Sequence, residues 1–456
     1  MHTISQQKKN INDYSNTKKT NFKDSLLTNL ENLESNNPKS FWNLLDKIKR
    51  FDSSAETPNA ENIPVYEWIN HFTSISKKLD KHNNHDLLRE IEELEKQTPS
   101  NIFLNLNNAI TISELKNIIR KLKNNKSPGE DMLLNEMLKY GSSILLPALT
   151  KLFNLILSTS HFPHQWNESL ISLLHKKGSF YDTNNYRGIS ITSCLSKCFT
   201  ALMADRLLNC LETNNLLHFS QAAYRKKSRT TDHIFTFKSI LNNYCLKKKQ
   251  KLYCCFIDFK KAFDSVWRDA MLLKLLQLGI GGEFYYLIKN MYSITKSRIR
   301  FSKGLTEYFH SELGIKQGDC LSPILFNVFI NDMHSIFDNH CDGILVNDIK
   351  LNHLLFADDL VIVSETRSGL QKCLDKLHDY TQTWALDINI GKIKAIIFQR
   401  YGKRTQDNFN IGGLEIEQVN KYTYLGIPFD SSGCFTSAEI ELKSKALKAM
   451  FQLQST

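Results

Sequence analysis

The sequence predicts an α+β fold in which helices pack on an antiparallel sheet, and three observations support this. Residues 252–259 form an apolar run with one acid, Asp258, near its end, as a buried central strand does. Residues 354–363 place two adjacent acids, Asp358 and Asp359, between apolar segments rich in β-formers, a pattern typical of strand, tight turn and strand. Amphipathic helical patterns follow these two runs, over 267–278 and 370–384.

Composition limits the classes of protein to which the chain can belong. Its 456 residues are enough for two to three domains or subdomains. The formal charge of +11 and the pI of about 9.0 permit a polyanionic partner, although charge alone does not establish one. There is no run of eighteen apolar residues and no apolar signal core at the N-terminus, so we expect no membrane span and an intracellular location. The ten cysteines include no C-x-x-C pair, which favours free core thiols over zinc ligands or disulfides.

The amino-terminal part is predicted to consist of two segments. Residues 1–20 are polar and rich in Asn and Lys, which indicates a disordered tail. Residues 21–98 are predicted to form a helical segment, in which the aromatic stripes at 41–45 and 66–72 are interpreted as packing.

The next helix is predicted to begin at residues 111–114, where Ser or Thr capping and an acid in the first turn form a start signal. It leads into the turn 124–131, which contains Pro and Gly. For Lys126 in this turn two interpretations are open, a nucleic-acid contact or a place in a plain helix–helix turn.

Two basic segments follow. Strands are predicted at 170–174 and 185–191, and such a basic hairpin can fold over a triphosphate, because Lys supplies a point charge and Arg a planar fork. The loop 221–233 places four cations near one aromatic, which suits a nucleic-acid backbone or a base-stacking surface, although a solvated basic face is the open alternative. The cations of these segments are Lys176, Lys177 and Arg187 in the hairpin, and Arg225, Lys226, Lys227 and Arg229 in the loop.

Further elements are predicted from pattern alone. Residues 297–301 alternate polar and apolar side chains, as an exposed edge strand does. The loop 313–323 has glycines that allow a close approach of its backbone, and it precedes an apolar helix over 324–333. A strand over 395–399 and a last helix over about 437–454 complete the prediction.

The acids of the two opening strands indicate a metal site. Two carboxylates held on one hairpin repel each other at neutral pH, and a divalent cation relieves that repulsion. A solvated turn is the ordinary alternative for an acidic hairpin. The acid at the end of the upstream strand favours the metal, because Asp258 facing Asp358 would form a two-metal site for phosphoryl transfer.

In this order, Asp258 with Phe263, Gln317-Gly318-Asp319 and Phe356-Ala357-Asp358-Asp359 resemble the successive motifs of a reverse transcriptase. The surrounding sequence resembles the enzymes of non-LTR (LINE-type) retrotransposons over about residues 113–426. The resemblance implies a right-hand polymerase with a reverse transcriptase domain at about 154–427. Its parts are expected as fingers at 99–240, palm at 241–436 and the start of a truncated thumb at 437–456.

The resemblance also implies an activity and its ligands. The enzyme would transfer nucleotides from dNTPs to the 3′-hydroxyl of a DNA primer on an RNA template. Two Mg²⁺ ions, or Mn²⁺, would be held by Asp258, Asp358 and the main-chain carbonyl of Phe259, with Asp359 as a supporting acid. Mg²⁺ is favoured over zinc because these ligands are hard oxygens. Lys392 would protonate the pyrophosphate.

Nucleotide contacts are implied for Arg187 and for Lys176 or Lys177, which the sequence does not separate. Phe263 would exclude a ribose 2′-hydroxyl, with core packing as the alternative, and Gln317 and Gly318 would shape the nucleotide pocket. The turn at Tyr424, Leu425 and Gly426 resembles the one that grips the primer. Departures from the family pattern are Gly188, Cys320 and Ile393, where relatives carry Pro, Pro and a hydroxyl residue.

Two rival functions remain open. No endonuclease or Cys/His knuckle is recognised in the sequence, so the first rival is a truncated, catalytically inert element remnant that binds nucleic acid. The second is an RNA polymerase that copies RNA, which Phe263 disfavours. The resemblance implies a nuclear location, with the cytoplasm as alternative, and the oligomeric state and insertion target are not predicted.

Overall fold

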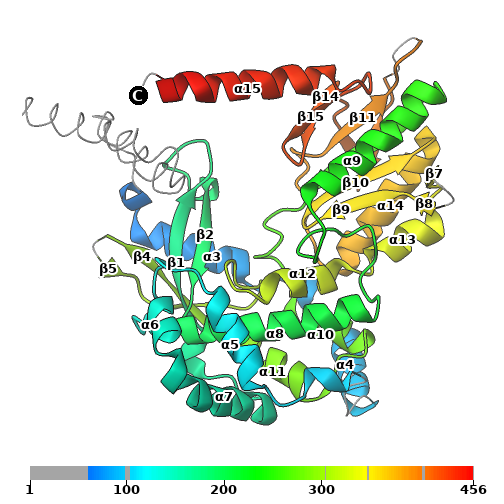
Figure 1. Cartoon of the computed structure of the whole chain (residues 1–456). Coiled ribbons are helices and arrows are strands. Elements are labelled where there is room, and N and C mark those ends of the chain that lie inside the picture. The colour runs from blue at the N-terminus through cyan, green and yellow to red at the C-terminus, as the bar shows by residue number, and fades with distance from the viewer. Residues whose placement is uncertain (1–59, 98–102, 303, 347–348, 403–405, 455–456) are drawn as a thin grey trace, which may run out of the picture. The chain divides into compact units, whose positions relative to one another are not determined.

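Figure 1 shows a computed structural model, which describes residues 60–97, 103–302, 304–346, 349–402 and 406–454. The predicted tail at 1–20, and the helical segment as far as residue 59 with its stripe at 41–45, lie outside the described residues. The chain divides into two compact units, Met1–Asn62 with Lys443–Thr456, and Ile63–Leu442. The second unit contains all the site residues discussed below.

The acids lie on a four-stranded antiparallel sheet with the strand order β11-β3-β10-β9. Its strands are β3 (Leu252–Asp258), β9 (His353–Phe356), β10 (Asp359–Ser364) and β11 (Lys394–Phe398). Alternate residues of β3 enter two different cores, with Cys255 and Ile257 in one and Cys254 and Phe256 in the other. The run is therefore apolar throughout because both faces of the sheet are covered, as predicted.

A second sheet has the strand order β2-β1-β4-β5, with β6 also paired to β4. Its strands are β1 (Glu168–His175), β2 (Tyr186–Ile191), β4 (Thr295–Phe301), β5 (Gly304–Leu305) and β6 (Phe309–Ser311). The prediction that 297–301 is an edge strand is wrong, because β4 pairs with β1 in parallel on one side and with β5 and β6 on the other. Small polar side chains fit in this interior, where the Ser169 and Ser297 hydroxyls lie 2.8 Å apart.

Helices fill the space around the sheets, and several follow the predicted bounds. The predicted helix start is confirmed, since the Thr111 hydroxyl accepts the main-chain N–H of Glu114 at 3.2 Å. The predicted helix over 324–333 is shorter, because it ends at Ile330 and a new helix begins at Met333. The helices are α3 (Val65–Ser76), α4 (His85–Gln97), α5 (Ile112–Lys121), α6 (Asn135–Tyr140), α7 (Ser142–Thr159), α8 (Cys194–Thr213), α9 (Thr230–Leu241), α10 (Arg268–Gln277), α11 (Gly282–Ser293), α12 (Ser322–Ile330), α13 (Met333–His340), α14 (Arg367–Thr383) and α15 (Thr436–Gln454).

Three short hairpins complete the described elements. They are β7 (Ile344–Val346) with β8 (Ile349–Leu351), β12 (Phe409–Ile411) with β13 (Leu414–Ile416), and β14 (Lys421–Tyr424) with β15 (Ile427–Asp430). The last hairpin packs Tyr424 and Phe429 into the same core as Phe256. The turn predicted at 424–426 is therefore attached to the sheet that carries the acids.

One helix bears on the question of a membrane. Within the described part of the chain, α7 is the one helix that is long and apolar enough to cross a bilayer by length and composition. It buries Leu149, Phe153 and Ile156 in the core, while Ile144 and Leu155 are exposed. Helices at the centre of globular folds meet the same criteria, so the expected absence of a membrane span stays a prediction.

The loop after β6 is predicted to tolerate no side chain at Gly314. Gly314 has φ +80°, and a Cβ there would lie 2.6 Å from the carbonyl oxygen of Asp264. Gly413 has φ +79°, yet a Cβ there would meet nothing within 4 Å. Both Gly→Ala changes add the cost of a left-handed alanine, but only Gly314→Ala adds a clash with the backbone. We expect Gly314→Ala to lower the free energy of unfolding by about 1–3 kcal/mol more than Gly413→Ala, as measured by urea denaturation. Equal losses would show that the loop yields to the added methyl group.

Candidate active site

The two acidic strands are adjacent and in a fixed register. Asp359 lies directly across from Asp258 in the β10–β3 pair, and across from Phe356 in the β10–β9 pair. Residues opposite each other in an antiparallel pair point to the same face, so both carboxylates leave the sheet on one side. Ala357 and Asp358 form the turn between β9 and β10, with Ala357 at φ +54°. The predicted hairpin is confirmed.

Burial and neighbouring charges raise the pKa of the two acids of the hairpin, Asp358 and Asp359. Burial raises the pKa of Asp359 to about 6, and the neighbouring charges of Asp358 and Asp258 add to the effect. The pKa of Asp358 is raised by burial and by the carboxylate of Asp258. Acids that disfavour one another's ionised form are the arrangement that a bound divalent cation relieves.

Lys392 is the cation closest to this cluster in the structure. Its Nζ lies 2.7 Å from Oδ2 of Asp258, and the Asn389 side-chain amide donates to the same oxygen at 3.3 Å. The main-chain N–H of Asn389 donates to the Asp258 carbonyl at 2.9 Å, and Phe259 forms a bridge with Ile388. The segment before β11 thus fixes the end of β3, and Lys392 offsets part of the negative charge.

The basic hairpin of β1 and β2 brings two cations to the acids. The pKa of Lys176 is lowered by burial and by Arg187 and Lys392, while Asp264 and Asp258 oppose that change. Arg187 lies opposite Leu174 in the β1–β2 pair, and its charge also acts on Asp358. The charge of Lys176 therefore interacts with the acids Asp258 and Asp264.

Phe263 and Asp264 continue the chain beyond β3. The ring of Phe263 stacks on Phe326 at 4.9 Å and meets the Tyr224 ring edge-on at 6.4 Å. Burial raises the pKa of Asp264 to about 6, and both its oxygens lie 2.9 Å from Nε2 of Gln317. Phe263, the aromatic predicted to contact the sugar, therefore follows the acid strand and precedes Asp264, which fixes the direction of the Gln317 amide.

The loop of Gln317 and Gly318 runs along β2. The Gln317 carbonyl accepts the N–H of Ser190 at 2.7 Å, and Gly318 has φ +108°. A Cβ at Gly318 would lie 2.9 Å from the Ser190 carbonyl oxygen, so only glycine fits there. Asp319 points elsewhere, since its carboxylate accepts the Thr200 hydroxyl and the N–H of Leu321, both at 2.8 Å. The third residue of this motif is structural.

Two tyrosines near the acids were not predicted as site residues, although Tyr224 is the aromatic of the basic loop 221–233. The pKa of Tyr422 is raised to about 12 by burial and by the charges of Asp359 and Asp258, and its ring stacks on Phe256 at 4.4 Å. The pKa of Tyr224 is raised by burial and by Asp358. Tyr422 could have been found from the sequence, because it lies two residues before Tyr424 and therefore just before the turn that resembles the primer grip.

The residues predicted to contact nucleic acid differ in whether the fold leaves them accessible. Arg225 is committed to the fold, because its guanidinium forms two hydrogen bonds with Glu212, at 2.8 and 2.9 Å, and donates to the His218 carbonyl. The guanidinium of Arg225 is thus already paired within the fold, and its contact with nucleic acid stays a prediction. Tyr424 is also buried, with its hydroxyl 3.4 Å from Nδ1 of His233.

The other predicted contacts lie at the surface. Lys226 binds the Asn209 side chain, and the N–H of Arg229 donates to Asp232 at 2.7 Å as α9 begins. Leu425 and Gly426 form the tip of the β14–β15 hairpin. Lys126 and Lys227 are exposed. Contacts of these residues with nucleic acid stay predictions.

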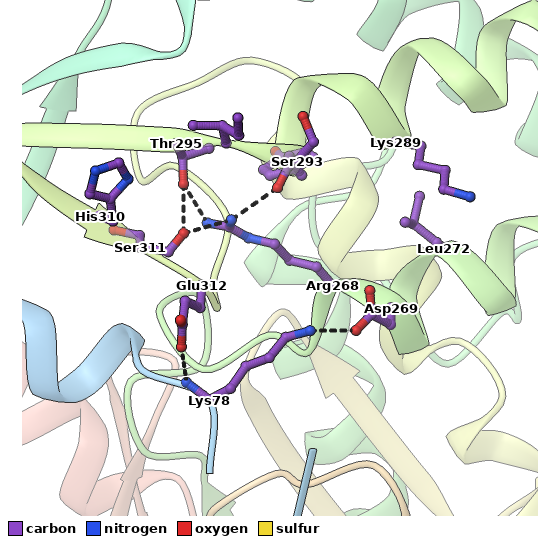
Figure 2. Close-up of a pocket in the computed structure, with 12 residues that line it drawn as sticks. Lys78, Arg268, Asp269, Leu272, Lys289, Ser293, Thr295, His310, Ser311 and Glu312 are labelled. Carbon is purple, nitrogen blue, oxygen red and sulfur yellow. Dashed lines mark hydrogen bonds and ion pairs between the residues drawn. The ribbon is translucent and has the colours of Figure 1, made fainter. Parts of the chain in front are cut away.

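A separate pocket of about 500 Å³ lies at the ends of α10 and α11 (Figure 2). Lys78 forms an ion pair with Asp269 at 2.7 Å, and its main-chain N–H donates to Glu312 at 2.8 Å. Arg268 donates to the Ser311 carbonyl and to the Thr295 hydroxyl, so these cations are already used by the fold. None of the predicted site residues lines this pocket.

Comparisons with known proteins agree with this geometry. The family model described as reverse transcriptase (RNA-dependent DNA polymerase) matches residues 174–429. The chain is 27% identical to the RNA-directed DNA polymerase from mobile element jockey of Drosophila melanogaster, over 87% of this chain and 44% of that protein. It is 27% identical to the probable RNA-directed DNA polymerase from transposon X-element of the same organism, over 81% of this chain and 41% of that protein. The chain therefore spans less than half the length of these relatives.

A solved structure is also similar. It is apo telomerase from Candida tropicalis truncated from its C-terminal domain, with 16% sequence identity and a TM-score of 0.42. The match covers 66% of this chain and 59% of that one.

The crowding of acids predicts an unusual effect of pH on the metal-free chain. The pKa of Asp359 is about 6 in the folded chain and about 3.9 when unfolded, so its contribution to stability is present at low pH and lost as the pH rises through 6. Asp359→Asn removes this loss. In EDTA at pH 7.5 we expect the variant to be more stable than the parent by about 1 kcal/mol, a value reduced for solvent screening, with the gain shrinking towards pH 5.

Urea denaturation at several pH values measures this difference. Asp80→Asn is the control, because Asp80 is exposed and lies outside the cluster. If the gain in the free energy of unfolding does not depend on pH, the pKa of Asp359 is not raised by its burial and its neighbouring acids.

Proposed function

Because the chain belongs to the reverse transcriptase (RNA-dependent DNA polymerase) family, we propose that it copies an RNA template into DNA at the acids of β3 and the β9–β10 hairpin. The observation that supports this most is the convergence of Asp258, Asp358 and Asp359 with Lys176 and Arg187 from a separate hairpin. Carboxylates close to cations suit a triphosphate bound with metal ions.

The acids fit Mg²⁺, and Mn²⁺ could replace it. The donors are hard carboxylate oxygens, and burial together with the neighbouring acids raises the pKa of Asp358 and Asp359, which is the condition that a divalent ion relieves. Asp258 and Asp358 would hold the ions, with Asp359 and the carbonyl of Phe259 beside them. When bound, the ions activate the primer 3′-hydroxyl and stabilise the leaving pyrophosphate. Lys392, which pairs with Asp258, would donate a proton to the leaving group.

The remaining side chains would orient the incoming dNTP. Lys176 and Arg187 would bind its phosphates, and Arg187 offers two parallel donors. Phe263 would lie under the sugar, held by the ring of Phe326, and would exclude a 2′-hydroxyl. Gln317 would contact the nucleotide with its amide direction set by Asp264.

The similarity to jockey and the X-element supports a non-LTR retrotransposon as the source of the chain. The template would then be RNA and the primer DNA, with the nucleus as the place of action and the cytoplasm as alternative. The fingers, palm and thumb would occupy the residues expected from the sequence. An inert remnant and an RNA polymerase are the alternatives.

Primer extension distinguishes these functions. With a DNA primer annealed to RNA, Mg²⁺ and dNTPs, the chain should lengthen the primer, whereas NTPs should give little product. Asp258→Asn should reduce the rate by at least about 10³-fold, because it removes a metal ligand needed only for the chemical step. Asp80→Asn should leave the rate unchanged. Extension with NTPs alone would identify an RNA polymerase, and binding without extension would identify an inert remnant.

The two hairpin lysines provide a matched test of the triphosphate contact. Lys176→Ala should raise the KM for dNTP by about 10-fold, since a charge-assisted contact to phosphate contributes about 1.5–3 kcal/mol, partly screened here. Lys177→Ala should change KM less than twofold. Steady-state extension at varied dNTP measures both values. If Lys177→Ala has the larger effect, the hairpin binds the nucleotide in another register.

A further inference from the structure

A second group of potential metal ligands lies on α13 and the loop after α8. His334 and Asp338 are four residues apart on α13, so they lie on one face of that helix. His218 approaches from the loop, and its Nε2 lies 3.6 Å from Oδ2 of Asp338. One ligand atom from each of the three residues lies within 4.8 Å of the other two. Among the described residues this is the one such group of three His, Cys, Asp or Glu side chains.

Hydrogen bonds fix which ring nitrogen of His334 carries its proton. Nδ1 of His334 lies 2.6 Å from the carbonyl oxygen of Asn331, which can only accept. The proton is therefore on Nδ1, and Nε2 keeps its lone pair. Metal-binding histidines in proteins are oriented by this kind of contact from the other ring nitrogen.

A chain of hydrogen bonds does the same for His218. It begins where the Asn352 amide donates to Oδ1 of Asp338 at 3.0 Å, which leaves the Asn352 oxygen to accept from Nδ1 of His353 at 2.6 Å. Nε2 of His353 then accepts the Ser220 hydroxyl proton at 2.6 Å, and the Ser220 oxygen accepts from Nδ1 of His218 at 2.8 Å. These contacts are shorter than the 3.3 Å approach of the Ser220 N–H to Nδ1, so they govern the tautomer.

The consequence is that lone pairs of these residues face one another. Nε2 of His218 and the Asp338 oxygen are both acceptors, yet they face each other at 3.6 Å. A ring nitrogen of His334 completes the group, and the His334 ring is parallel to that of His218 with the ring centroids 4.2 Å apart. Three converging acceptors repel one another unless a cation binds between them.

We propose that His218, His334 and Asp338 bind a zinc-type ion, distinct from the Mg²⁺ expected at the β3 and β9–β10 acids. Two imidazole nitrogens and one carboxylate oxygen are a ligand set that zinc accepts, whereas Mg²⁺ prefers oxygen alone. Bonds of about 2.0–2.1 Å at tetrahedral angles put ligand atoms about 3.3 Å apart. The separation of His218 and Asp338, at 3.6 Å, is near this value already, and a shift of at most about 1.5 Å would bring in His334. The Asp338 side chain is 38% exposed, so water can supply a fourth ligand.

The ion would support the catalytic hairpin from outside. The loop that carries His218 pairs with β9, because Leu355 donates to the Ser220 carbonyl at 2.9 Å and Ala222 donates to Leu355 at 3.1 Å. The side chain of Gln221 also accepts the N–H of Ala357, in the acid turn, at 3.2 Å. Figure 1 shows α13 next to the sheet that contains β9 and β10. A metal joining α13 to this loop would hold β9, and with it the turn of Asp358.

Zinc titration of the whole chain tests the proposal. The chain is freed of metal with EDTA, exchanged into excess Mg²⁺ to occupy the hard-oxygen site, and titrated with Zn²⁺ by calorimetry. The parent and His340→Gln should bind one equivalent that His334→Gln and Asp338→Asn lack. His340 is the matched control, because it is exposed on the same helix and lies outside the group. Zn²⁺ should also raise the melting temperature of the parent and of His340→Gln only, since an ion that binds the folded state stabilises it.

Ser220→Ala tests the hydrogen-bond chain, because it leaves every ligand in place. Loss of such an orienting partner typically weakens metal binding about 10–100-fold, and we expect a zinc Kd raised by at least about 10-fold. An unchanged Kd would show that the chain does not orient His218.

Other results would overturn the proposal. These are equal zinc binding by the parent and His334→Gln, no zinc binding by either, or a Co²⁺ spectrum of thiolate ligation, which would place the metal on cysteines. A proton shared by His218 and Asp338 would appear as pH-dependent stability that Zn²⁺ does not change. Because the parent is measured with Mg²⁺ present, failure here leaves the proposed polymerase activity to be judged by primer extension alone.

Discussion

The active site depends on one register, which places Asp359 of β10 opposite Asp258 of β3. A slip by one residue would turn every side chain of a strand to the other face, and here each face belongs to a separate core. The apolar residues of β3 and β10 therefore fix the position of two acids that repel each other. Hydrophobic burial on both faces of the sheet holds a charge arrangement that would be unfavourable by itself.

The cations around these acids come from distant parts of the chain. Lys176 and Arg187 lie on the β1–β2 hairpin, whereas Lys392 precedes β11 and pairs with Asp258. They offset the acids in the metal-free chain, and metal ions and a triphosphate would rearrange the same charges. The proposed zinc site would stabilise β9 and the acid turn after it, through the loop that pairs with β9.

Polar and charged residues close together in sequence have different tasks in this fold. In the segment 316–319, Gln317 donates to Asp264 near the acids, whereas the half-buried Lys316 donates to the Trp166 and Asn167 carbonyls. Burial lowers the pKa of that lysine to about 8, and Asp319 opposes the change. Arg225 resembles a nucleic-acid contact in sequence but serves Glu212. A basic excess thus overstates the number of cations available to a ligand.

The sequence by itself determined the features that local chemistry controls. The acidic hairpin, the cap at Thr111 and the buried strand at 252–258 were predicted, because turn residues, capping contacts and alternation act within a few positions. The family was predicted from the resemblance of the motifs. Only the tertiary structure decided that β4 is interior, that the charge of Lys176 interacts with Asp258, and that Tyr422 stacks on Phe256 of the acid strand. Each of these outcomes depends on partners far away in sequence. The burial and electrostatic energies that select such partners exist only once the chain has closed those long loops.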